Sequence, residues 1–146
     1  MTPMTADEIN AFFYKAFPGR DGRTTVEHAD GKTARCRIRY DETQLRPGGT
    51  LSGPTMMALA DMVAYALVFS AIGFSPLSVT TSLSINFLRK PGPADLLAEG
   101  RVLKRGKSLL VADVFIRSEN EDDPCAHAVV TYSIPPAKVP AHSSSV

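Results

Sequence analysis

The sequence predicts an α+β fold in which an antiparallel sheet wraps around one long central helix. Residues 54–72 form a nearly unbroken apolar run, long enough for about five helical turns. Four segments rich in apolar and β-branched residues follow this run, and turn sequences separate them. A helix that is apolar on all sides must be covered by other elements, so we expect the sheet to enclose it.

The chain of 146 residues has the length of one domain and the composition of an ordinary soluble protein. We expect a single domain over residues 1–137 and a flexible, serine-rich tail over residues 138–146. The formal net charge of +1 gives no field that would favour nucleic acid or an acidic membrane. The N-terminus lacks the pattern of a secretory signal, and Cys36 and Cys125 are isolated, so we expect a reducing, cytoplasmic location.

A first helix is expected after Thr5, because a glutamate three residues later completes a capping box. Apolar residues recur at helical intervals as far as Phe17, and Pro18-Gly19 should end this helix. The polar residues 20–31 are expected to form turns. Residues Thr33–Tyr40 alternate between apolar side chains and arginines, which predicts a half-buried strand.

A loop over residues 41–49 should lead into the long helix, with Ser52 or Gly53 as its cap. The four strands after it are expected at Ser78–Leu88, Leu96–Lys104, Leu109–Ser118 and Ala126–Ile134. Residues 54–72 are also long enough to span a membrane. Asp61 near the middle and the lack of flanking basic residues argue against a membrane span.

Asp61 is the strongest candidate for a functional residue, because it is the only charged side chain in the apolar helix. A carboxylate in an apolar segment is costly unless it is paired or used. The glycine-rich turn before the helix should leave a backbone N–H free near Gly53, which suits a developing negative charge. An acid together with such a donor indicates acyl transfer. From residue type alone, Asp61 can equally be a structural hydrogen-bond acceptor.

Gly53 and Asp61 are eight residues apart, which corresponds to about 12 Å along a helix axis. One reacting carbon cannot lie about 3 Å from both groups of the same helix. If both groups serve one reaction, they must therefore come from two protomers whose helices run antiparallel.

Four segments together resemble the PaaI-like acyl-CoA thioesterases of the hotdog fold. They are Gly49–Asp61, Val79–Arg89, Ala98–Lys107 and Thr131–Ile134. The resemblance implies a homodimer, or a homotetramer built as a dimer of dimers, with acyl-CoA sites at the subunit interface. It also implies that the Gly53 N–H holds the oxyanion, that Asp61 is general base or nucleophile, and that Thr80 assists.

The start of the long helix differs from the usual pattern of that family. Ser52 replaces the usual histidine, Pro54 replaces a second glycine, and Arg46 replaces an asparagine. Ser52 is expected to cap the helix and to lie beside the substrate, without acting as a nucleophile. Arg46 is a candidate substrate contact or an ordinary loop cation.

Basic residues gather at two expected strand ends and are candidates to bind coenzyme A phosphates. They are Arg89 with Lys90, and Arg105 with Lys107, and the hydroxyl of the adjacent Ser108 is a candidate contact with them. An equally good explanation is that they form solvated turns. We assign no metal, because the histidines show no metal-binding spacing; these are His28, His127 and His142.

The sequence therefore predicts a thioesterase that hydrolyses an acyl-CoA to a carboxylate and free coenzyme A, without a metal or redox cofactor. The resemblance implies a short or medium-chain or aromatic acyl group. The alternative is a non-hydrolytic acyl-CoA-binding hotdog protein, which the Ser52-Gly53-Pro54 start favours. A hydratase or dehydratase of the same fold is disfavoured, because no histidine lies between His28 and His127.

Overall fold

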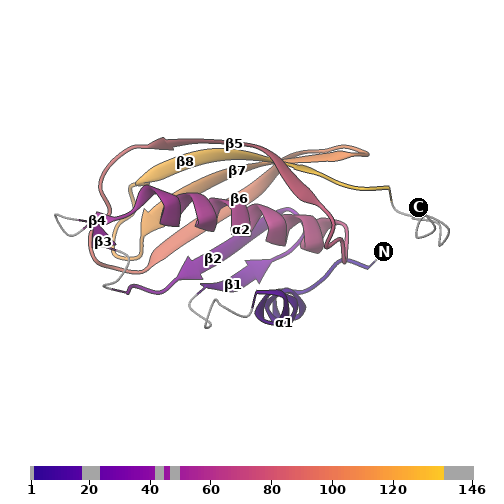
Figure 1. Cartoon of the computed structure of the whole chain (residues 1–146), viewed down its shortest axis with the longest axis horizontal. Coiled ribbons are helices and arrows are strands. Elements are labelled where there is room, and N and C mark those ends of the chain that lie inside the picture. The colour runs from indigo at the N-terminus through magenta and orange to yellow at the C-terminus, as the bar shows by residue number, and fades with distance from the viewer. Residues whose placement is uncertain (1, 18–23, 42–44, 47–49, 137–146) are drawn as a thin grey trace.

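The computed structural model shows a six-stranded antiparallel sheet curved around one long helix, α2 (Figure 1). It describes residues 2–17, 24–41, 45–46 and 50–136, with the backbone alone described at 45–46 and 50–51. The elements are α1 (Ala6–Ala16), β1 (Thr24–Ala29), β2 (Thr33–Ile38), β3 (Leu45–Arg46), β4 (Thr50–Leu51), α2 (Gly53–Ala71), β5 (Val79–Phe87), β6 (Leu96–Arg105), β7 (Leu109–Ser118) and β8 (Ala126–Ser133). The strand order is β1-β2-β6-β7-β8-β5, which confirms the predicted fold class and leaves β5 at one edge of the sheet.

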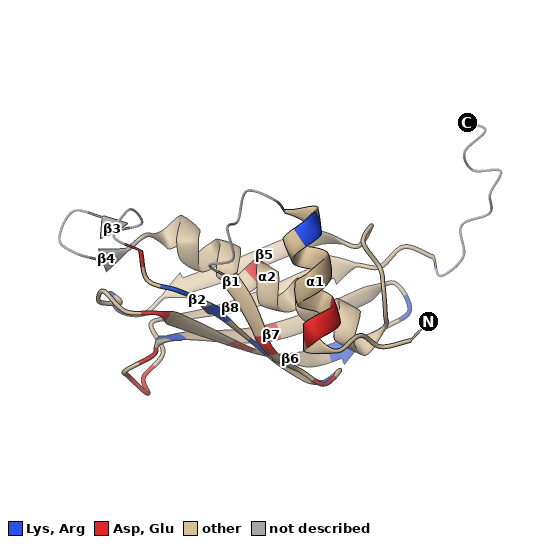
Figure 2. Ribbon diagram, turned by 90° about the horizontal axis from the view of Figure 1, so that it is seen from below, with Lys and Arg blue, Asp and Glu red and all other residues tan. Residues whose placement is uncertain are grey.

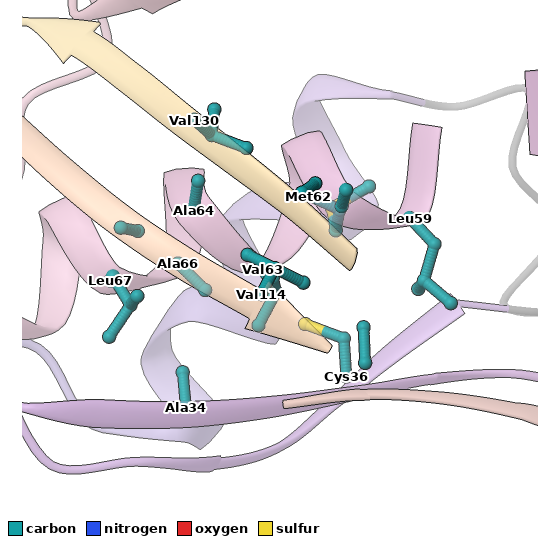
Figure 3. Packing of buried hydrophobic residues seen from close by; sticks show 14 of the residues in the cluster. Ala34, Cys36, Leu59, Met62, Val63, Ala64, Ala66, Leu67, Val114 and Val130 are labelled. Atoms are coloured by element: carbon teal, nitrogen blue, oxygen red, sulfur yellow. The ribbon is translucent and has the colours of Figure 1, made fainter. Parts of the chain in front are cut away.

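The core lies between α2 and the concave face of the sheet. Side chains at alternate positions of the strands point toward the helix, among them Ala34, Cys36, Val114 and Val130 (Figure 3). Charged residues occupy several of the outward-facing positions of β2, β6 and β7 (Figure 2). This alternation is why one sheet can cover an apolar helix and still face water on its other side.

Gly100 on β6 allows α2 to approach the sheet closely, which gives a test of the packing. A Cβ at this position would lie 3.2 Å from Cδ1 of Leu67 and 3.4 Å from Cγ1 of Val63. Gly100→Ala should therefore lower the free energy of unfolding by about 1–3 kcal/mol, measured by urea denaturation. Gly92→Ala is the matched control, because nothing lies within 4 Å of a Cβ there. Equal stability of the two variants would contradict this account of the packing.

Helix α1 begins as predicted, because Thr5 and Glu8 form the complete capping box. Residues 20–31 were expected to form turns, and this was wrong, because Thr24–Ala29 forms β1. Only Val26 of this strand is buried, so the sequence shows no apolar alternation there. The Asn10 side chain holds the strand in place by exchanging two 2.8 Å hydrogen bonds with the backbone of Val26.

The other predicted elements lie close to their expected positions. All four strands after α2 are confirmed, with ends that shift by one residue at most. The strand expected at Thr33–Tyr40 already ends at Ile38, and Tyr40 is half-buried. The loop expected over residues 41–49 contains β3, which pairs with β4. The expected tail, 138–146, lies outside the described residues.

Helix α2 is long and apolar enough to cross a membrane by length and composition alone. Two thirds of it is buried inside the fold, as is usual for the core helix of a globular domain.

Candidate active site

The first turn of α2 leaves one backbone donor without a partner among the described residues. Ser52 is the N-cap, and its Oγ accepts a 3.2 Å hydrogen bond from the Thr55 N–H. Pro54 carries no N–H, and the Met56 N–H donates to the Ser52 carbonyl. No described residue accepts a hydrogen bond from the Gly53 N–H. The Ser-Gly-Pro start therefore concentrates the positive end of the helix dipole on a single donor.

Gly53 lies in a pocket of about 310 Å³ with Phe87, Arg89 and Lys90. A Cβ on Gly53 would lie 3.2 Å from Cζ of Phe87, so the ring packs directly over the start of the helix. Arg89 forms a 2.6 Å ion pair with Glu121, and this contact raises the pKa of Arg89. Two of the predicted phosphate-binding residues are thus placed beside the free N–H of Gly53.

Asp61 is half-buried and lies at a second pocket, of about 250 Å³, between α2 and the start of β5. Its Oδ1 accepts a 2.5 Å hydrogen bond from Thr80 Oγ1 and a 2.9 Å hydrogen bond from the Tyr132 hydroxyl. Asp61 is the only charged residue of α2. The carboxylate is therefore open to a ligand and held in one orientation.

The backbone explains why Thr80 reaches Asp61. Thr80 is directly opposite Tyr132 on β8, and the register then shifts between Thr80 and Ser82. Residues directly opposite each other in a sheet share a face, so both hydroxyls lie on the side of the helix. Such irregularities often redirect side chains near functional sites.

Two tyrosines form the aromatic side of the Asp61 pocket. Burial raises the pKa of the Tyr132 hydroxyl, and it also raises the pKa of Tyr65, with a smaller contribution from the charge of Asp61. Both hydroxyls therefore stay protonated and act as donors: Tyr132 donates to Asp61, and Tyr65 donates to the Pro76 carbonyl at 2.8 Å.

A single chain does not bring all the predicted site residues together. The pockets of Gly53 and Asp61 share no residue. Arg105, Lys107 and Ser108 lie at the turn between β6 and β7, at the Asp61 end of the sheet. The side chain of Arg46 lies outside the described part of the chain. Among the described residues, no group of three or more His, Cys, Asp or Glu side chains is placed to hold a metal.

Tyr132 is the residue at this site that the sequence reasoning missed. It appeared only as part of a matching segment, and a tyrosine in an apolar strand is usually a core residue. Its pairing with Thr80 depends on the register of β5 and β8, which no local pattern specifies.

Comparisons with known proteins identify the family of this chain. The family model of the thioesterase superfamily matches residues 48–125, more than half of the chain. The chain is 30% identical over 110 residues to a protein of Saccharolobus solfataricus described as a candidate esterase, covering 75% of this chain and 71% of that protein. The structure of a protein of Silicibacter sp. TM1040 described as a candidate thioesterase is 40% identical, covers 93% of this chain and 95% of its own, and has a TM-score of 0.84.

A thioesterase of Haemophilus influenzae shares the fold at 18% identity, with a TM-score of 0.82 over 97% of both chains. The sheet, the enclosed helix and these likenesses define a hotdog thioesterase fold. The chain belongs to the thioesterase superfamily.

Proposed function

We propose that this protein hydrolyses acyl-CoA thioesters at a site shared by two subunits. The proposal rests on two features of the chain. One is the oriented carboxylate of Asp61, and the other is a helix start at which the Gly53 N–H has no partner among the described residues. A base for water and a donor for the oxyanion are the two groups that thioester hydrolysis requires.

The edge strand β5 supports the two-subunit site. Most of its residues are exposed, including Val79 and Phe87 at its two ends, so its edge is free to pair with another strand. Thr80 at its start contacts Asp61, and Phe87 at its end packs on Gly53. When two β5 edges pair antiparallel about their midpoint, Asp61 of one subunit comes next to the Gly53 of the other. A homodimer, alone or paired into a tetramer, is therefore part of the proposal.

In the proposed reaction, Asp61 acts as a general base on water. Asp61 takes a proton from water, and the water oxygen bonds to the thioester carbon. The carbonyl electron pair moves to its oxygen, which the Gly53 N–H of the other subunit stabilises. The C–S bond then breaks, and the coenzyme A sulfur takes the proton back from Asp61. Direct attack by the carboxylate, followed by hydrolysis of the anhydride, uses the same groups.

The same pairing gathers the candidate phosphate contacts. In one chain Arg89 and Lys90 lie beside Gly53, whereas Arg105 and Lys107 lie at the Asp61 end of the sheet. Antiparallel pairing of two subunits places Arg89 and Lys90 of one subunit at the same end of the assembly as Arg105 and Lys107 of the other. Cationic side chains there would hold the phosphates of coenzyme A.

Charge reversal tests the phosphate role. Arg105→Glu combined with Lys107→Glu should raise the KM for an acyl-CoA by about 3–10-fold, because exposed ion pairs are individually weak. The KM for an acyl thioester of a small neutral thiol should stay unchanged. Lys15→Glu with Arg35→Glu gives the same change in net charge, on α1 and on the outer face of β2, and serves as the control. An equal rise in KM for both thioesters would contradict a role in phosphate binding.

The function itself is tested by measuring thiol release over a panel of acyl-CoA thioesters, with Asp61→Ala as the control. Short or medium-chain and aromatic acyl groups are the expected substrates. Saturable binding of acyl-CoA without thiol release would select the non-hydrolytic binding protein instead. The cytoplasmic location remains a prediction.

A further inference from the structure

The hydrogen bonds at Asp61 are unequal between its two oxygens. Thr80 Oγ1 and the Tyr132 hydroxyl both donate to Oδ1, at 2.5 Å and 2.9 Å. No described residue donates to Oδ2. Two donors on one oxygen fix the plane of the carboxylate and leave the other oxygen available to react.

Tyr132 is itself held more rigidly than a substrate-binding side chain usually is. It is 3% exposed, and its ring stacks on Tyr65 with centroids 5.4 Å apart and planes 13° apart. Tyr65 stacks in turn on Phe13 of α1, at 5.5 Å and 12°. This row of three rings runs from α1 through α2 to β8 and ends at the hydroxyl that contacts Asp61.

We infer that Tyr132 is a positioning residue, which together with Thr80 holds Oδ1 of Asp61 so that Oδ2 is the oxygen that accepts the proton or attacks the thioester. The inference rests on the proposed function for the identity of the reaction. The positioning itself can be observed without turnover. The other ionisable groups that line the pocket in the described chain are phenols, Tyr65 and Tyr132 itself, so no second charge competes for the carboxylate.

Tyr132→Phe removes the donor and keeps the buried ring. Hydrogen bonds to an ionised carboxylate favour its charged form, and one such bond accounts for about a tenfold effect. The variant should therefore lower kcat by about tenfold with little change in KM. Tyr65→Phe is the matched control, because it removes a hydroxyl that donates to Pro76 and leaves both donors to Asp61 in place, so it should lower kcat less.

A second readout does not depend on activity. In protein with ¹³C-labelled aspartate carboxyls, the Asp61 signal is assigned by its loss in Asp61→Asn. This signal should move in Tyr132→Phe, because its oxygen loses a donor, and stay in place in Tyr65→Phe. In protein with ¹³C-labelled tyrosine rings, the Tyr132 signal should move in Asp61→Asn, because the acceptor of its hydroxyl loses its charge.

The outcomes separate the inference from the proposed function. A shifted Asp61 carboxyl signal in Tyr132→Phe without any thiol release supports the positioning role and removes the thioesterase assignment. Active enzyme whose kcat and Asp61 carboxyl signal are both unchanged by Tyr132→Phe overturns the inference. If Tyr132→Phe does not fold, the tyrosine signal decides, and its failure to respond to Asp61→Asn overturns the inference equally.

Discussion

Asp61→Asn is expected to lower kcat by about 100-fold or more with any acyl-CoA that the protein hydrolyses. The amide oxygen can still accept the hydrogen bonds of Thr80 and Tyr132, so the local structure should persist. An amide cannot take a proton from water or attack as a carboxylate does. The fall in kcat therefore reports the lost chemistry, and steady-state thiol release measures it.

Asp113→Asn provides the comparison for this experiment. Asp113 is also a buried aspartate, with a hydrogen bond to His127 and an ion pair with Arg101, but it lies on the outer face of the sheet. Its replacement should leave kcat near the wild-type value even if it lowers stability. Turnover close to wild type in both Asp61→Asn and Asp61→Ala would remove Asp61 from the chemistry.

The sequence was sufficient to predict the elements that depend on residue patterns within a single segment. The apolar run of α2, with one charge near its middle, favours a position in the core, and the alternation at Ala34 and Cys36 indicates which face of β2 is buried. The single charge at Asp61 was visible for the same reason, because a carboxylate in such a helix stands out against its neighbours. These features required no knowledge of which strand pairs with which.

The features that the sequence missed all depend on tertiary contacts. Strand β1 exists because β2 and the Asn10 side chain pair with a polar segment. Tyr132 reaches Asp61 only because of the register of two strands that lie 39 residues or more apart in the chain. The free N–H of Gly53 follows from the choice of Ser52 as the cap, which the sequence alone left open.

Gly53→Pro is expected to lower kcat by about 100-fold, since it deletes the one free donor of the helix start. Proline is well tolerated at the first position of a helix. The preceding Ser52 has φ −78° and ψ 154°, an extended conformation that a residue before proline prefers. Gly53→Ala adds the same Cβ against Phe87 and keeps the N–H, so it should be the milder change.

Mixing two inactive variants then tests whether the site is shared. Asp61→Asn and Gly53→Pro chains are denatured together in equal amounts and refolded. Half of the dimers should contain one chain of each kind. Each of these mixed dimers has two sites, and only one of them combines an unmutated Asp61 with an unmutated Gly53. The mixture should therefore recover about a quarter of wild-type activity. If Asp61 and Gly53 of the same chain served one reaction, no intact site would form and the mixture would stay as inactive as its parents.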